Sequence, residues 1–148
     1  MSLTEYRRKR DFLKTGEPEG EAGEGGKKGA VYVIQRHQAT HLHYDFRLEK
    51  DGVLKSWAVP KEPPTEKGVK RLAMMVEDHP LDYAAFEGEI PEGEYGAGTV
   101  QVWDRGTYEA EAWGENEIVV NIHGVKMNGR YCLIKFKKEK NSWLWFKG

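Results

Sequence analysis

The residues best suited to chemistry lie in one run, from Gln35 to Glu49. From His41 onward the run alternates with a period of two. A β-strand sends alternate side chains to opposite faces, so this alternation predicts a strand with one apolar face and one ionisable face. The apolar positions are Leu42, Tyr44, Phe46 and Leu48, and the ionisable positions are His41, His43, Asp45, Arg47 and Glu49.

The ionisable face has the composition of a metal and phosphate site rather than of a solvated surface, which would carry mainly Thr, Lys, Glu and Ser. Two imidazoles and one carboxylate bind a divalent transition metal and leave coordination positions open. His43 and Asp45 share the face, and either His37 or His41 can supply a third ligand. Arg47 follows on the same face, where a guanidinium suits a phosphate or carboxylate that the metal also contacts.

Short strands separated by turns must position these residues. The pattern predicts strands at 31–37, 42–49, 53–59, 71–77, 99–104, 107–113, 117–123, 131–137 and 142–147. Asp51-Gly52 and Asn128-Gly129 are typical of tight hairpin turns, whereas Pro80 predicts a turn over 78–83. About eight short strands favour an all-β fold, a small closed or nearly closed antiparallel β-barrel, with a sandwich as the alternative. In such a barrel we expect the polar face to point inward, into a ligand cavity.

The first 29 residues differ in character from the rest. Ser2 and Glu5 have the spacing of a capping box, which predicts a short N-terminal helix over 2–14. Residues 16–29 are rich in Gly, Glu and Lys, so we expect a flexible loop. The barrel would occupy 30–148, and the whole chain, 1–148, suits a single domain.

Composition narrows the class of protein. The net charge of -1 argues against a protein that coats long stretches of nucleic acid, although a local basic pocket can still grip a phosphate. No apolar run is long enough to span a membrane, and the N-terminus lacks the apolar core of a signal peptide. The single Cys132 excludes an internal disulfide. We therefore expect a cytoplasmic monomer with no membrane association.

Long strings of residues support a family assignment. The chain resembles, over nearly its whole length, the 3′-phosphoesterase module of bacterial ATP-dependent DNA ligase D and its stand-alone prokaryotic form. The strings that carry the resemblance are Lys9 to Phe12 with Thr15 and Glu17-Pro18, His37 to Leu48, Leu54 to Lys61, Val76 to Tyr83, Phe86 to Gly88, Ile90 to Gly93, Tyr95 to Val100, and Trp103-Asp104.

The resemblance implies a β-barrel with a concave, metal-dependent active site. It implies removal of 3′-terminal ribonucleosides and 3′-phosphates from primer strands, with nucleic acid 3′ ends as partners and a ligase, polymerase or end-joining factors acting in trans. Manganese is the metal expected, and zinc or cobalt also suits the ligands. His41 is not among the positions that it implies. These positions are metal ligands His37, His43 and Asp45; catalytic His79, Arg47 and Tyr83; phosphate-binding Arg10, Lys61, Arg71 and Ser56; and supporting Asp11, Glu17 and Glu77.

Two other functions fit parts of the pattern. His43-x-Asp45 with a distant histidine, either His79 or His123, resembles the triad of a non-haem iron oxygenase. A non-catalytic module that binds nucleic-acid ends is the other alternative. Outside the proposed site, we expect Tyr95 and the five tryptophans to pack in the core and His123 to end a strand.

Overall fold

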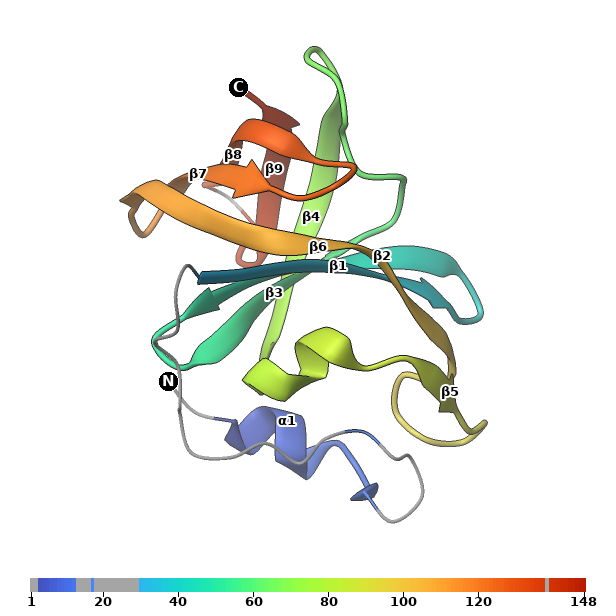
Figure 1. Ribbon diagram of the computed structural model, residues 1–148. Helices are drawn as coiled ribbons and strands as arrows, with labels where there is room; N and C mark the ends of the chain where they lie inside the picture. The colour runs from blue at the N-terminus through green and yellow to red at the C-terminus, as the bar shows by residue number, and fades with distance from the viewer. Residues whose placement is uncertain (1–2, 13–16, 18–29, 138) are drawn as a thin grey trace.

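The computed structural model describes residues 3–12, 17, 30–137 and 139–148. In this part of the chain nine antiparallel strands form the body of the molecule, with two short helices beside them (Figure 1). No described helix has the length and apolar character needed to cross a membrane. The elements are α1 (Thr4–Arg8), β1 (Ala30–Gln38), β2 (Leu42–Lys50), β3 (Val53–Val59), β4 (Lys70–His79), the 3₁₀ helix η1 (Leu81–Ala85), β5 (Gly88–Ile90), β6 (Gly98–Trp113), β7 (Glu117–His123), β8 (Asn128–Lys135) and β9 (Ser142–Lys147).

The predicted antiparallel barrel is confirmed. The strands follow the order β1-β2-β3-β4-β9-β8-β7-β6, and a pairing between β1 and β6 closes the ring. The short β5 pairs with the start of β6 and lies outside the ring. The all-β prediction therefore holds, and the sandwich alternative is wrong.

Apolar side chains fill the barrel interior. Tyr44, Phe46 and Leu48 of β2 belong to a core that strands all around the ring share, and Phe46 stacks on Trp145 at 4.1 Å between ring centroids. Trp57, Trp143 and Trp145 are buried there, while Trp103 and Trp113 pack against its edge. Core positions are thus confirmed for three of the five tryptophans, and the other two lie at the edge of the core.

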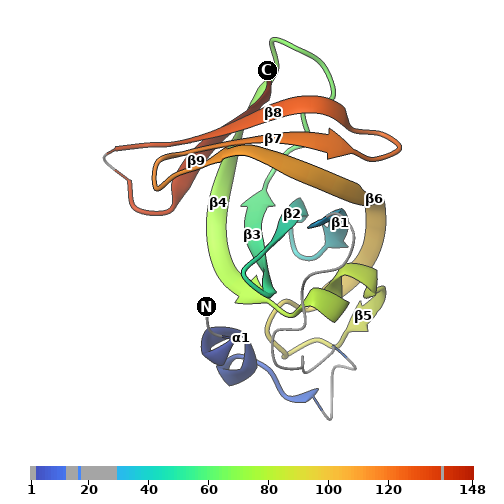
Figure 2. The ribbon, with the colours of Figure 1, turned by 60° about the vertical axis from the view of Figure 1, so that its left-hand side comes forward.

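The polar face of β2 lies on the other side of the same strands, so the expected inward orientation is wrong. Helices α1 and η1 and strand β5 gather on this outer side, at the end of the molecule away from β7 and β8 (Figure 2). A second apolar cluster packs beneath the two helices and includes Tyr6, Val33, Leu54, Tyr83 and Ala84. The alternation along β2 predicts two faces but not which of them is enclosed. The apolar face is enclosed because most of the apolar side chains of the other strands also point into the barrel.

The first predicted hairpin is confirmed and the second is displaced. Asp51 and Gly52 have φ values of 55° and 83°, as a two-residue turn with both residues left-handed requires. Asn128 and Gly129 instead lie within β8. The turn occupies residues 124–127, because the buried carboxylate of Asp104 accepts the backbone N–H groups of Val125, Lys126 and Met127.

Two strands are longer than predicted. The segments 99–104 and 107–113 form one continuous strand, β6, because Gly106 allows a close backbone approach rather than a turn: a Cβ there would lie 1.9 Å from the carbonyl oxygen of His123. Likewise β4 continues to His79, and the chain turns only at Pro80, which precedes η1. The predicted turn over 78–83 is therefore wrong in its first two residues.

The N-terminal helix is shorter than predicted. Helix α1 ends at Arg8, and Leu3 occupies its N-cap without a side-chain hydrogen bond, while the predicted capping residue Ser2 lies outside the described residues. Glu5 pairs with Arg8 at 2.6 Å. The backbone N–H of Arg10 bonds to the Arg7 carbonyl, and the Arg10 guanidinium bonds to the Tyr6 carbonyl. The loop expected at 16–29 lies, apart from Glu17, outside the described residues.

Candidate functional site

His37, His43 and Asp45 come together on the outer face of β1 and β2. His37 is the direct cross-strand partner of His43, and opposite residues of an antiparallel pair project from the same face. One ligand atom from each of the three residues lies within 4.8 Å of the others. The turn at residues 39–41 creates this pairing, and it leaves His41 exposed and outside the group.

The hydrogen bonding of His37 fits a metal ligand. Its Nε2 lies 2.7 Å from the carbonyl oxygen of Gly96, which can only accept, so Nε2 carries the proton. Its Nδ1 faces Asp45 Oδ2 at 3.7 Å, beyond hydrogen-bond distance. A histidine held by a backbone carbonyl through one nitrogen, with the other toward a carboxylate, is a common arrangement of metal-ligating histidines.

Electrostatics around Asp45 keep its carboxylate ionised and favour a proton on the neighbouring His43. Burial opposes ionisation of this carboxyl, but the Arg47 charge and the neighbouring imidazoles of His37 and His43 hold its pKa well below the ordinary value. For His43, burial is outweighed by the hydrogen bond to Asp45 at 3.3 Å, so its pKa is raised. The donor set is thus ready for a divalent metal, for which protons on His43 would compete.

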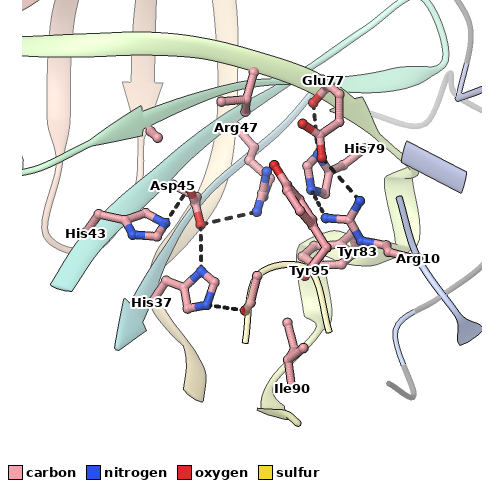
Figure 3. Close-up of a pocket in the computed structure, with 13 residues that line it drawn as sticks. Arg10, His37, His43, Asp45, Arg47, Glu77, His79, Tyr83, Ile90 and Tyr95 are labelled. Atoms are coloured by element: carbon pink, nitrogen blue, oxygen red, sulfur yellow. Dashed lines mark hydrogen bonds and ion pairs between the residues drawn. The ribbon is translucent and has the colours of Figure 1, made fainter. Parts of the chain in front are cut away.

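Arg47 links the metal-ligand group, which consists of His37, His43 and Asp45, to the rest of the site (Figure 3). Its side chain is 3% exposed, and Nη2 lies 3.5 Å from Asp45 Oδ2. Its Nε donates to Gln35 at 2.7 Å and its Nη1 to Ser56 at 2.9 Å. The guanidinium also lies over the Tyr83 ring, 4.9 Å from its centroid. These contacts hold the buried guanidinium of Arg47 in a single orientation.

His79 is buried and neutral. Its Nδ1 lies 3.0 Å from the Glu77 carbonyl oxygen and must donate, so Nε2 accepts from Arg10 Nη2 at 3.3 Å. Burial, followed by the charges of Arg47 and Arg10, holds the pKa of His79 well below its ordinary value. The imidazole therefore presents a lone pair on Nε2 beside two guanidinium groups.

The segment after α1 is tied to the barrel through Arg10. Its guanidinium pairs with Glu17 at 3.0 Å and with Glu77 at 3.2 Å. Glu17 also accepts a hydrogen bond from the Tyr83 hydroxyl at 2.6 Å. Burial raises the pKa of Tyr83, so the phenol stays protonated.

These residues surround a cavity of about 310 Å³ (Figure 3). Of the predicted site residues, Ser56 lies behind Arg47 and Glu17 behind Arg10. The lining residues are Arg10, His37, His43, Asp45, Arg47, Ala58, Val76, Glu77, His79, Tyr83, Ile90, Tyr95 and Gly96.

Besides Ser56 and Glu17, three more of the predicted site residues do not line the cavity. Lys61 is exposed in the bend after β3, and Asp11 is exposed beyond α1. Arg71 lies near the start of β4, where its Nε donates to the Glu62 carbonyl at 2.6 Å. Neither distant histidine proposed for an oxygenase triad belongs to the metal-ligand group, since His79 faces Arg10 and the exposed His123 bonds to Glu109 at 2.9 Å. His123 does end β7, as expected.

Two residues of the site were missed. Gln35 is fully buried and joins Arg47 to η1, since its Nε2 donates to the carbonyls of Tyr83 and Phe86. Gln35 lies two residues before His37 on β1, and this spacing in a strand places both side chains on the same face. The sequence spacing could therefore have identified Gln35. Tyr95 was expected to pack in the barrel, but it is 46% exposed and lines the cavity. The glycines around it form a loop outside the barrel.

Comparisons with known proteins find similar sequences over most of the chain. The model of the DNA ligase D 3′-phosphoesterase domain matches residues 35–135. A multifunctional non-homologous end joining protein LigD from Mycobacterium bovis is 52% identical over 146 residues, which cover 96% of this chain and 19% of that protein. The corresponding protein from Pseudomonas aeruginosa is 50% identical over 150 residues, covering 97% of this chain and 18% of its own length. The chain thus spans about a fifth of these relatives.

Proposed function

The chain belongs to the family of DNA ligase D 3′-phosphoesterase domains, and on this basis we propose that it is a metal-dependent phosphoesterase of nucleic-acid 3′ ends. Its substrates would be primer strands that end in a ribonucleoside or a 3′-phosphate, and its product a 3′-hydroxyl. The names of the relatives, which refer to non-homologous end joining, support a role in DNA repair.

The observation that carries this proposal is the meeting of two groups at Asp45. On one side lie the imidazoles of His37 and His43, and on the other the buried guanidinium of Arg47. Manganese bound by this donor set, or zinc or cobalt in its place, would act as a Lewis acid on a phosphate oxygen. A phosphate at this point would contact both the metal and the cation.

Arg47 and Arg10 would bind the phosphate. Both guanidinium groups line the cavity and both are held by buried partners. Cations fixed in advance stabilise the charge that grows on the equatorial oxygens without reorganising during the reaction. Ser56, Glu17, Glu77 and Gln35 would keep the two groups in place, and the hydroxyl of Tyr83 would act through Glu17.

His79 would accept a proton in the first step. Its pKa lies well below the ordinary value, so at neutral pH it is a base and not an acid. Water attacks phosphorus, one water proton moves to Nε2 in place of the 3.3 Å contact from Arg10 Nη2, and the bond from phosphorus to the 5′-oxygen of the terminal ribonucleoside breaks. That oxygen takes the proton from Nε2 of His79 and leaves as a hydroxyl, and the primer retains a 3′-phosphate. A second water then displaces the 3′-oxygen of the primer as a hydroxyl and releases inorganic phosphate.

Lys61 and Arg71 lie outside the cavity, so for these two residues we propose contacts with more distant phosphates of the strand. We further propose that the protein acts in the cytoplasm as a monomer, on ends that a ligase, a polymerase and end-joining factors process in trans.

The test uses a 5′-labelled primer annealed to a template and ending in one ribonucleotide. With manganese we expect conversion first to a 3′-phosphate and then to a 3′-hydroxyl, which gel mobility distinguishes. With a chelator the primer should stay intact. Binding of the primer without cleavage, with every metal tried, would support the non-catalytic end-binding module instead.

A further inference from the structure

A second hollow adjoins the cavity. It has a volume of about 490 Å³ and lies between α1, the end of β4 and the loop that connects β5 to β6. Val76, Glu77 and Tyr95 line both spaces, so the second lies directly beside the first. We call it the α1 groove. Its lining residues are Glu5, Lys9, Met75, Val76, Glu77, Asp78, Tyr95 and Asn141.

Tyr95 stands at the boundary between the two spaces. Its side chain extends from the loop after β5 toward Arg10, whose guanidinium carbon lies 5.2 Å from the ring centroid (Figure 3). Lys9 holds it, with Nζ 3.3 Å from the hydroxyl and 4.7 Å from the ring centroid. The neighbouring Gly96 carbonyl is bonded to His37. The ring is therefore fixed at both ends, yet it remains 46% exposed.

Such a ring is suited to stack on a nucleobase. Stacking on an exposed aromatic side chain is a general and sequence-tolerant way to bind single-stranded nucleic acid. Met75 and Val76, which are partly buried, add apolar surface to the groove.

The polar groups of the groove match hydroxyls better than phosphates. Asp78, Glu5 and Asn141 offer acceptor oxygens, and Lys9 is the one cation among the lining residues. The guanidinium groups of Arg10 and Arg47 line the first cavity instead. Beyond the phosphate under attack, a primer strand carries further phosphates, whereas the terminal ribonucleoside carries only a base and hydroxyl groups.

We propose that the α1 groove receives the departing 3′-terminal ribonucleoside and that Tyr95 stacks on its base. This inference rests on the proposed function, and it makes Tyr95 a determinant of which 3′ ends are cleaved. The phosphate occupies the first cavity, and the nucleoside that leaves as a 5′-hydroxyl compound occupies the second.

Two primers of the same sequence test the proposal, one ending in a ribonucleoside and the other in a 3′-phosphate. Only the first has a group to place in the groove. Tyr95→Leu removes the ring, and we expect kcat/KM for the first primer to fall about tenfold more than that for the second. Tyr95→Phe keeps the ring and loses only the hydroxyl contact with Lys9, so the ratio between primers should stay near that of the unchanged protein. Asn141→Ala should shift the ratio in the same direction as Tyr95→Leu.

Equal losses on both primers would overturn the proposal, because they would place the primer strand itself in the groove. An unchanged ratio in Tyr95→Leu would overturn it as well. Saturation-transfer NMR with millimolar adenosine gives a readout without turnover: we expect contact that Tyr95→Phe keeps and Tyr95→Leu loses. Absence of contact with the unchanged protein contradicts the groove assignment. Adenosine contact without cleavage of either primer contradicts the proposed function alone.

Discussion

Replacement of Gln35 by methionine should both destabilise the protein and disable the site. The side chain is fully buried, and methionine has a similar length and volume but no amide. The change removes the acceptor of Arg47 Nε, 2.7 Å away, and the donor to the Phe86 carbonyl, 3.0 Å away. The Tyr83 carbonyl keeps the backbone N–H of Phe86 as a second partner. One charged donor, on Arg47, and one carbonyl, on Phe86, thus lose their hydrogen-bond partners.

The expected loss follows from these two groups. An unsatisfied buried polar group costs about 1–3 kcal/mol, and more when it is charged, so the free energy of unfolding should fall by about 3–6 kcal/mol. That is a large share of the roughly 5–15 kcal/mol that stabilises a typical domain. Because Arg47 also loses its orientation, we expect phosphate-bond cleavage to fall with it.

Denaturant unfolding in a chelator measures the stability term without a contribution from metal. The matched control is Gln38→Met on the same strand, since Gln38 is exposed and accepts only a long contact of 3.4 Å from Arg36. The control should change stability by less than about 0.5 kcal/mol. A loss below about 1 kcal/mol in Gln35→Met, with cleavage intact, would refute the role assigned to the amide.

Three further predictions concern the metal ligands and His79. His43→Ala should stay folded, because its side chain is 28% exposed, and should weaken manganese binding by more than about 100-fold in a calorimetric titration; unchanged affinity would exclude it as a ligand. Gly96→Ala should weaken manganese binding about 10- to 100-fold, because φ is 78° there and the strained backbone would shift the carbonyl that orients His37; equal titration curves would contradict this. His79 has a lowered folded-state pKa, so the unfolded chain binds the extra proton, and stability should fall as pH decreases below about 6.5, by up to about 1.4 kcal/mol per pH unit. Urea unfolding at several pH values in that range should show that the free energy of unfolding depends less on pH in His79→Gln than in the unchanged protein. An identical dependence on pH would show that His79 titrates normally.

The local parts of this structure were predictable from sequence. The alternation over 42–48 assigns each residue of β2 to a face, because the period of a strand is a property of adjacent residues. Asp51-Gly52 predicts its hairpin because both residues tolerate a left-handed backbone.

Features that depend on distant partners were not predictable. Nothing near Asn128-Gly129 reveals that Asp104, more than twenty residues earlier, holds the turn at 124–127. Gly106 resembles a strand break, whereas the backbone of β7 is what requires it. The alternation of β2 separates two faces without showing which is enclosed, since that depends on the summed apolar surface of eight strands. Lys61 and Arg71 were assigned by resemblance alone, and nothing in their own spacing places them near Arg47.

The outward orientation of the polar face has a consequence for the size of molecule that can reach it. The lumen of a small barrel admits only a compact ligand, and a chain of nucleotides would have to be threaded into it. Under the proposed function, a cavity on the outer wall, beside η1 and the segment after α1, can accept one end of a long polymer while the remainder lies across the surface. The closed barrel then forms a rigid support behind the reacting end of the nucleic acid. Neither entry of the nucleic acid nor release of the shortened product requires a β-strand of the barrel to separate from its neighbours.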